Sequence, residues 1–374
     1  MARIAKAAVL DRIGGEFEVK EYEVPEPAPG TFILRTEMAG VCGTDAHMYY
    51  GHLAGVPYPI VLGHEFCGIL DRLGEGVTHD LRDEPVQEGD RVIMLPGVAC
   101  GRCYFCAVAR TPNRCTNSRV YGFALDDEFP LAGGFSQYVY ARFPGTGFIK
   151  TDLPARVAVL TEPINIAVHG VNRGRVYAGD TVVIQGSGAI GLATLIIARY
   201  SGAARTIVTG GPARRLELAR ELGADVTIDI GEVRDADERV RLVLEATPGR
   251  RGADIVFECA GVPAALPEGL RMVRDSGRFV EMGHFTDMGP VEINPHWHLM
   301  QKNLDLYAVW GGGVPYFLQA VALMERREYP YEKLVDPIIG LGRIKEAVEA
   351  IIKGGWRMDG QEVIKIAVDP WKEE

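Results

Sequence analysis

The sequence predicts a two-domain α/β protein, in which a β-rich N-terminal domain is followed by a doubly wound parallel sheet. The chain has 374 residues, which is too long for one ordinary hydrophobic core. Before about residue 160 it shows short β-type runs separated by Gly and Pro, such as residues 32–40, 89–95 and 133–141. After residue 180, β-branched runs alternate with helical segments, which is typical of a parallel sheet.

Composition and charge exclude several function classes. The formal net charge is −10, and a nucleic-acid or anionic-membrane partner requires a basic surface. Two uncharged stretches, residues 181–198 and 307–324, contain GSG and GGGVP, which would break a lipid-facing helix. The first residues show no signal-peptide pattern. We therefore expect a cytoplasmic protein with neither a membrane span nor a nucleic-acid partner.

The N-terminal domain carries a candidate catalytic metal site in GVCGTDAH and GHEFCG. Cys42, His64 and Glu65 are all good zinc ligands, and a catalytic zinc needs three protein ligands and one open position. Taken singly, a lone Cys or His is more often a buried core residue. However, Thr44 and His47 follow the cysteine within one turn, and a hydroxyl followed by an imidazole can carry a proton to solvent.

A second cysteine-rich segment follows, with four thiols in sixteen residues: Cys100, Cys103, Cys106 and Cys115. A disulfide knot, a redox centre and a metal site are the three alternatives. Disulfides are disfavoured in the cytosol, and a redox Cys-x-x-Cys pair requires a βαβ context that this Gly/Pro/Asn-rich loop lacks. Four thiolates suit a closed tetrahedral zinc site, so we expect a structural zinc ion.

A dinucleotide fingerprint opens the second domain. Residues 181–185 form a short β-branched run, and the turn that follows contains Gly186, Gly188, Ala189, Ile190 and Gly191 in the pattern GxGxxG. An apolar helical segment comes next, and this strand–turn–helix context makes an otherwise weak pattern specific. The turn would place a pyrophosphate at the helix N-terminus.

The alternation continues to residue 311 and predicts six parallel strands of a Rossmann domain. Five further strands are expected at residues 205–210, 225–230, 254–261, 277–283 and 304–311, with an amphipathic helix over 213–224. The tail ends in EVIKIAVDP, a strand that could return to the first domain.

These motifs together resemble the zinc-dependent medium-chain alcohol dehydrogenase family, in its polyol, threonine and secondary-alcohol branch. CGTDAH, GHExxG, GDRV, the four-cysteine lobe and GSGAIG occur in the family's order over essentially the whole chain. The resemblance implies a GroES-like catalytic domain (1–165) with the zinc lobe at about 96–118, a Rossmann domain (166–310), and a C-terminal segment (311–374) completing the first domain.

The same resemblance implies the roles of the site residues. Catalytic zinc would be held by Cys42, His64 and Glu65, together with the Glu162 of TEPINIAVHG, where liver-type enzymes have cysteine. Glu162 could instead be an ordinary helix N-terminal carboxylate. Thr44 and His47 would form the proton relay. The lobe departs from the family in having eight residues, rather than seven, between its last two cysteines.

The cofactor preference follows from a missing acid. An NAD enzyme usually ends the second strand with Asp or Glu, whereas this chain has Gly210 and Gly211 there, with Arg214 and Arg215 close behind. An arginine could bind a 2′-phosphate by a bidentate contact. Alternatively, the arginines are ordinary residues of a first helical turn. We expect NADP to be preferred, with NAD use remaining open.

The expected function is a zinc-dependent alcohol dehydrogenase that interconverts a secondary alcohol or polyol and its ketone with NAD(P). The alternatives are a zinc-free NADPH-dependent enone or quinone reductase of the same fold, and a non-catalytic cofactor-binding protein. Both should lack the set of Cys42, His64 and Glu65. The family resemblance further implies a homo-oligomer, either a dimer or a homotetramer.

Overall fold

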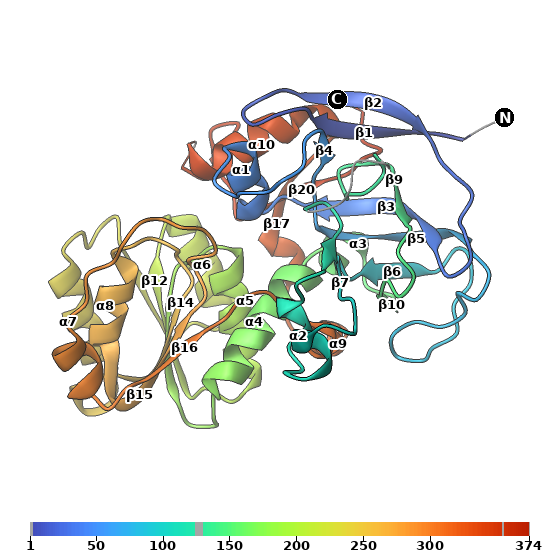
Figure 1. Cartoon of the computed structure of the whole chain (residues 1–374). Helices are drawn as coiled ribbons and strands as arrows, with labels where there is room; N and C mark the ends of the chain where they lie inside the picture. The colour runs from blue at the N-terminus through green and yellow to red at the C-terminus, as the bar shows by residue number, and fades with distance from the viewer. Residues whose placement is uncertain (1–2, 124–129, 354, 374) are drawn as a thin grey trace. The chain divides into compact units, whose positions relative to one another are not determined.

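The computed structural model describes residues 3–123, 130–353 and 355–373. The chain divides into two compact units (Figure 1). The first consists of Met1–Glu162 and Gly312–Glu374, and the second of Pro163–Gly311. The boundaries therefore fall after Glu162 and after Gly311, and the first unit is discontinuous in sequence.

The first unit is built mainly from strands. They are β1 (Ile4–Leu10), β2 (Phe17–Glu23), β3 (Phe32–Gly40), β4 (Ile60–Val61), β5 (Glu65–Leu73), β6 (Arg91–Met94), β7 (Gly97–Val98), β8 (Arg119–Val120), β9 (Tyr138–Ala141), β10 (Phe148–Lys150), β17 (Val335–Ile339), β18 (Arg357–Met358), β19 (Gln361–Glu362) and β20 (Lys365–Val368). The main sheet has the order β10-β6-β5-β3-β20-β17, with β9 also pairing with β3. A smaller sheet has the order β2-β1-β4, and β7-β8 and β18-β19 form separate hairpins.

The helices of the first unit are short. They are α1 (Gly43–Tyr49), α2 (Tyr104–Ala107), α3 (Ala155–Ala158), α9 (Val314–Met324) and α10 (Ile344–Ile352), with the 3-10 turns η1 (Pro112–Arg114), η4 (Tyr331–Leu334) and η5 (Leu341–Arg343). The buried core of this unit draws on both sequence segments. It includes Phe32 and Phe135 from the first segment, and Ile344 and Val348 of α10 from the second.

Strand register in the main sheet brings distant segments of the first unit together. β3 pairs antiparallel with β5, so that Gly40 lies opposite Glu65. On its other side β3 pairs with β20, and Ala367 lies opposite Gly40. In Figure 1 the red C-terminal strand β20 accordingly lies beside the blue β3. The C-terminal end of β3, the N-terminal end of β5 and the C-terminal part of β20 therefore lie next to one another.

The second unit contains one fully parallel sheet. Its strands are β11 (Thr181–Gln185), β12 (Arg205–Gly210), β13 (Val226–Asp229), β14 (Ala253–Glu258), β15 (Val273–Glu281) and β16 (Asp305–Ala308), in the order β13-β12-β11-β14-β15-β16. The order reverses direction between β11 and β14, which is the switch point where such sheets bind ligands. All five residues of β11 are buried, as expected for a central parallel strand.

Helices cover both faces of this sheet. They are α4 (Thr161–Gly174), which begins at the end of the first unit, α5 (Ala189–Tyr200), α6 (Ala213–Glu221), α7 (Ala236–Ala246) and α8 (Ala265–Met272), with the 3-10 turn η2 (Pro248–Arg250) and the π-helical η3 (His296–Met300). Gly174 of α4 packs against Val280, and Gly269 of α8 packs against Phe279. Because successive residues of a strand point to opposite faces, α4 and α8 lie on opposite sides of β15.

The prediction of a doubly wound parallel sheet is confirmed. The strands expected at 205–210 and 225–230 are β12 and β13, while β14 ends at Glu258, three residues earlier than expected. It ends there because the Glu258 carboxylate accepts hydrogen bonds from the amides of Ala260 and Gly261, which turns the chain. None of the helices formed by the described residues combines the length and hydropathy needed to cross a membrane.

Candidate functional site

The structure brings Cys42, His64 and Glu65 together in the first unit, with one ligand atom of each within 4.8 Å of the others. Cys42 follows β3 and is the N-cap residue of α1, while His64 and Glu65 stand at the start of β5. The register that pairs Gly40 with Glu65 explains why the three side chains meet. His64 and Glu65 are buried, and Cys42 is partly buried. A soft thiolate, an imidazole and a carboxylate form a ligand set that suits zinc.

Asp45 contacts two residues of this cluster, Cys42 and His64. One of its carboxylate oxygens accepts a hydrogen bond from the Cys42 amide at 2.7 Å, and the other lies 3.7 Å from Nδ1 of His64. Burial disfavours a charged imidazole, but the hydrogen bonds and charges of Asp45 and Cys42 outweigh it and raise the pKa of His64 well above its usual value. The cluster therefore favours a positive charge at this position.

A lysine that the sequence motifs did not reveal completes the cluster. Lys365 of β20 forms an ion pair with Glu65, and the two side chains are only 5% and 1% exposed. A Cβ atom on Gly40 would lie 2.1 Å from Oε2 of Glu65 and 2.9 Å from Cε of Lys365. A larger residue at position 40 would therefore displace the side chains of this buried pair.

Glu162, the second residue of α4, lies in the same electrostatic environment. Burial, followed by the charge of Glu65, raises its pKa to about 7, against the lowering effect of His64 and Lys365. It is not among the three residues whose ligand atoms cluster within 4.8 Å. The structure therefore places Glu162 close enough to sense the charges of the cluster, but outside its tight ligand set.

The two residues expected to relay protons both lie on α1. Thr44 is buried, with its hydroxyl 3.6 Å from Sγ of Cys42. Nδ1 of His47 lies 3.0 Å from Nδ1 of His52, a residue that the motifs did not assign to the relay. Burial, followed by the charge of His52, lowers the pKa of His47. Since His52 is exposed, this histidine pair reaches from a partly buried position to solvent.

The four cysteines of the lobe form a second cluster in the first unit, with their sulfur atoms within 4.8 Å of one another. Cys103 Sγ lies 3.5 Å from Cys106 Sγ and 3.8 Å from Cys115 Sγ. A tetrahedral site with zinc–sulfur bonds of about 2.3 Å has sulfur–sulfur edges of about 3.8 Å. All seven cysteines of the chain are free thiols. The spacing therefore fits a metal site and not a pair of disulfides.

Backbone amides are aimed at the sulfurs of this lobe. The amides of Cys100 and Asn117 donate to Cys115 Sγ at 3.3 and 3.4 Å. Backbone hydrogen bonds from Cys106 and Thr116 lower the pKa of Cys103 to about 6. The donors to Cys103 stabilise its thiolate, which is the form of cysteine that binds metal, whereas burial and the thiol of Cys103 raise the pKa of Cys106 to about 12.

In the second unit, the glycine turn has the geometry that a pyrophosphate requires. Gly186 has φ of +100°, and a Cβ atom there would lie 2.9 Å from the backbone of Cys259 and Ala260. At Gly191 a Cβ would lie 1.8 Å from the carbonyl oxygen of Gly186. Gly188 is the N-cap residue of α5, whose first residues are Ala189 and Ile190. The turn thus leaves the helix N-terminus open to an anion.

At the end of β12 the structure places an acidic residue that the sequence pattern did not predict. Gly210 and Gly211 lie against Ser187, whose hydroxyl is 3.0 Å from both the amide and the carbonyl oxygen of Gly211. Arg215 is buried beside Gly188, whereas Arg214 is exposed. Asp229 of β13 lies opposite Gly210, and one of its oxygens accepts a hydrogen bond from the Gly231 amide. Residues 181–215 contain no acidic residue, but the pairing of β12 with β13 places Asp229 beside Gly210.

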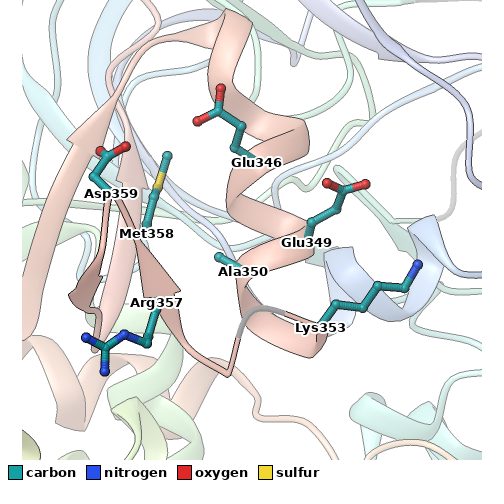
Figure 2. A pocket seen from close by; sticks show the side chains of 7 residues that line it. All are labelled: Glu346, Glu349, Ala350, Lys353, Arg357, Met358 and Asp359. Carbon is teal, nitrogen blue, oxygen red and sulfur yellow. The ribbon is translucent and has the colours of Figure 1, made fainter.

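An open pocket of about 430 Å³ lies elsewhere in the first unit, between α10 and the β18–β19 hairpin (Figure 2). Its charged groups are engaged with protein groups. Glu346 and Asp359 both pair with Arg343, and Glu349 accepts a hydrogen bond from Tyr49. The ammonium group of Lys353 lies 4.6 Å from the Tyr50 ring centroid. Neither metal cluster contributes to this pocket.

Comparison with known proteins agrees with this geometry. The profile of the alcohol dehydrogenase GroES-like domain matches residues 28–150, and that of zinc-binding dehydrogenases matches residues 189–326. The chain is 35% identical to 5-exo-hydroxycamphor dehydrogenase of Pseudomonas putida, over 94% of this chain and 96% of that protein. It is 32% identical to sorbitol dehydrogenase of Halalkalibacterium halodurans, over 98% and 99% of the two chains.

Solved structures give the same result. An alcohol dehydrogenase from Thermotoga maritima superposes with a TM-score of 0.91 at 30% identity, over 98% of this chain and 99% of that one. A zinc-binding dehydrogenase from Sinorhizobium meliloti 1021 bound to NADP has a TM-score of 0.83 at 28% identity, over 98% and 100%. An alcohol dehydrogenase from Escherichia coli CFT073 complexed with NADH has a TM-score of 0.81 at 27% identity, over 98% and 99%.

Proposed function

Since the chain belongs to the zinc-dependent medium-chain alcohol dehydrogenase family, we propose that it oxidises a secondary alcohol or polyol to a ketone, reversibly, with NADP as the preferred cofactor. The observation that carries the proposal is the buried cluster of Cys42, His64 and Glu65. A zinc-free reductase of the same fold has no use for a preformed thiolate–imidazole–carboxylate set, nor has a non-catalytic cofactor-binding protein.

We propose that Cys42, His64 and Glu65 hold the catalytic zinc, with Glu162 reaching the metal or its water. A zinc ion there supplies Lewis acidity, which favours the alkoxide form of a bound alcohol at neutral pH. Lys365 offsets part of the negative charge of Glu65 and so limits the net charge of the ligand set. In the metal-free cluster, burial and the charge of Glu65 raise the pKa of Glu162 to about 7, and a zinc ion there would lower it.

The proton of the alcohol would reach solvent through residues of α1, with a ribose hydroxyl of the cofactor between Thr44 and His47. The Thr44 hydroxyl lies beside the Cys42 sulfur and would accept this proton. His47, whose pKa is lowered by burial, is a suitable proton acceptor further along the helix. His52 contacts His47 and is exposed, so it would release the proton to water.

The cofactor assignment rests on residues of the second unit. The glycine turn of Gly186, Gly188 and Gly191 would bind the pyrophosphate. A 2′-phosphate would lie near Gly210, with Arg214 or Arg215 as its cationic partner, whereas Asp229, which lies opposite Gly210, would favour the ribose hydroxyls of NAD. The NADP complex of the Sinorhizobium meliloti structure supports this choice, and the NADH complex of the Escherichia coli structure is why NAD use must also be measured.

The remaining parts of the proposal concern the lobe, the assembly and the location. We propose that Cys100, Cys103, Cys106 and Cys115 hold a structural zinc ion. A homo-oligomer, dimer or tetramer, is supported by the uncovered edge strand β16, where Leu306 is 49% exposed. The seven free thiols support a cytoplasmic location.

The test combines metal analysis with a substrate screen. The purified full-length chain should contain zinc in the Cys42 cluster and the lobe, and should oxidise secondary alcohols or polyols such as sorbitol, 2,3-butanediol or 2-propanol. The Cys42→Ala variant should lose one zinc ion and its activity. Activity on primary alcohols only, or full activity after removal of the Cys42 zinc, would contradict the proposal.

A further inference from the structure

Glu258, Glu281 and His284 form a third cluster of potential metal ligands, in the second unit and outside the sites assigned above. Glu258 is the last residue of β14 and Glu281 the last residue of β15. These strands are parallel neighbours, and their register pairs Glu258 with Glu281. The fold therefore places two carboxylates side by side at the carboxyl edge of the sheet, with an imidazole three residues farther on.

Backbone amides orient both carboxylates. Oε1 of Glu258 accepts hydrogen bonds from Ala260 and Gly261 at 2.7 and 2.8 Å. Oε1 of Glu281 accepts from the amides of Gly283 and His284 at 3.0 and 3.1 Å. These contacts fix the two side chains, and Oε2 of Glu258 lies 3.5 Å from Nδ1 of His284.

The second oxygens of the two carboxylates lack hydrogen-bond partners. Oε2 of Glu258 and Oε2 of Glu281 are both buried without a donor among the described residues, as is Nε2 of His284. The Glu258 side chain is fully buried, and those of Glu281 and His284 are 19% and 17% exposed. Among the described residues, the ion-pair contacts of both glutamates are with His284 only. Two carboxylates in such surroundings require a positive charge.

The spacing of the three side chains suits a single small cation, with one ligand atom of each within 4.8 Å of the others. Nδ1 of His284 is hydrogen-bonded to Oε1 of Glu281 at 3.0 Å and lies 3.5 Å from the partnerless Oε2 of Glu258. Ligands held about 2.1 Å from a tetrahedral zinc ion are about 3.4 Å apart. Because an imidazole joins the two carboxylates, the set favours a transition-metal ion over magnesium or calcium. We propose that Glu258, Glu281 and His284 bind a zinc-type divalent cation in the dinucleotide-binding unit.

Such an ion would stabilise the loops after β14 and β15, which lie next to the glycine turn proposed to bind the cofactor. The segment that follows Glu258 lies against the glycine turn, because the backbone of Cys259 and Ala260 is the surface that a Cβ on Gly186 would strike. Gly261 in turn lies against Gly283 of the loop after β15. A cation that joins the ends of β14 and β15 would therefore fix both loops at the switch point of the sheet, and its loss should weaken dinucleotide binding.

A proton is the competing occupant. Burial, followed by the charge of Glu281, raises the pKa of Glu258 to about 8, so a metal-free cluster would hold a proton at neutral pH. A measurement of the metal content of the protein distinguishes a metal-bound cluster from a protonated one. Glu281→Gln and His284→Ala each remove one ligand, whereas Glu292→Gln and His296→Ala change exposed residues of the same unit and serve as matched controls.

The experiment counts zinc in the full-length chain by plasma mass spectrometry, after equilibration with Zn²⁺ and gel filtration. Glu281→Gln and His284→Ala should each contain about one zinc ion fewer than the parent and the controls. Their affinity for Zn²⁺ at the third site should fall at least about 100-fold. Equal zinc content in the parent and in both variants overturns the proposal. If one variant does not fold, as judged by circular dichroism, the other decides the outcome.

This count is independent of the proposed dehydrogenase function. Loss of zinc from Cys42→Ala reports on the first unit alone, so an empty Cys42 cluster leaves the difference between the parent and Glu281→Gln unchanged. NADP binding supplies a second readout. The dissociation constant of NADP should rise in Glu281→Gln and stay at the parent value in Glu292→Gln, and equal values in the two variants would contradict the role in the crevice.

Discussion

In the metal-free protein, replacement of Lys365 by methionine would leave the buried Glu65 carboxylate of the Cys42 cluster without its counter-charge. Lys365 and Glu65 form an ion pair with side-chain exposures of 5% and 1%. Removing one partner of a buried pair costs roughly 3–5 kcal/mol, because the other charge remains without compensation. Protonation of the buried carboxyl group would remove its charge, so the free energy of protonation sets an upper limit on the destabilisation, and this limit is of similar size. An ordinary glutamate carboxyl costs about 1.4 kcal/mol per pH unit to protonate above its pKa of about 4.3, or about 3.7 kcal/mol at pH 7.

The same reasoning gives the sign of the pH dependence. If Glu65 binds a proton in the folded variant, that state holds one proton more than the unfolded chain between pH 5 and pH 7. The free energy of unfolding of the variant then falls by about 1.4 kcal/mol for each unit that the pH rises. In the parent, the ion pair with Lys365 compensates the charge of Glu65, so no such slope is expected from this site. The destabilisation should be about 3–4 kcal/mol at pH 7 and about 1 kcal/mol at pH 5.

Urea unfolding at the two pH values measures both numbers. Lys345→Met is the matched control, since Lys345 pairs with Glu16 at the surface, with exposures of 32% and 70%. Surface pairs contribute about 0–1 kcal/mol, so the control should change little at either pH. The double variant Lys365→Met/Glu65→Gln should be less destabilised than the sum of its single changes. Equal stabilities of the Lys365→Met and Lys345→Met variants at pH 7 would refute the reasoning.

Three further predictions concern the metal sites, the relay and the cofactor. Cys42→Ala should lower kcat/KM at least about 1,000-fold with little change in Tm, and retained activity would mean that the catalytic site is elsewhere. Cys103→Ala should instead lower Tm by more than about 5 °C in calorimetry, because its site contributes folding free energy. His52→Ala should lower kcat about tenfold near neutral pH, with recovery on addition of imidazole, and a parent-like pH profile would remove His52 from the relay. Arg214→Ala or Arg215→Ala should lower kcat/KM for NADP but not for NAD, and a strong NAD preference that neither change affects would disprove the NADP assignment.

The sequence was sufficient for those features whose residues lie close together in it. The glycine turn lies directly between β11 and α5, and the four lobe cysteines lie within sixteen residues. Local spacing therefore contained the information for both. The six parallel strands could be predicted for a similar reason, since each contains β-branched or aromatic residues and is bounded by turn residues.

Features that depend on strand register could not be read from local patterns. Lys365 meets Glu65 only because β20 pairs with β3 next to β5. Asp229 reaches the end of β12 through the pairing of β12 with β13. The same limit applies to Glu258 and Glu281, which single-residue reasoning would treat as ordinary strand residues. Pairing between segments far apart in sequence decides all three contacts.

The discontinuity of the first unit has a consequence for synthesis of the chain. Lys365 is translated 300 residues after Glu65, and β20 is the last strand to leave the ribosome. At about 5–20 residues per second, Glu65 waits about 15–60 s for its counter-ion. The Gly40 end of β3 waits as long for β20, whereas residues 32–35 of β3 can pair earlier with β9. The second unit, Pro163–Gly311, is continuous and can fold within this interval. The continuous second unit can therefore be complete before the Gly40 end of β3 and the Glu65 side chain acquire their partners in β20.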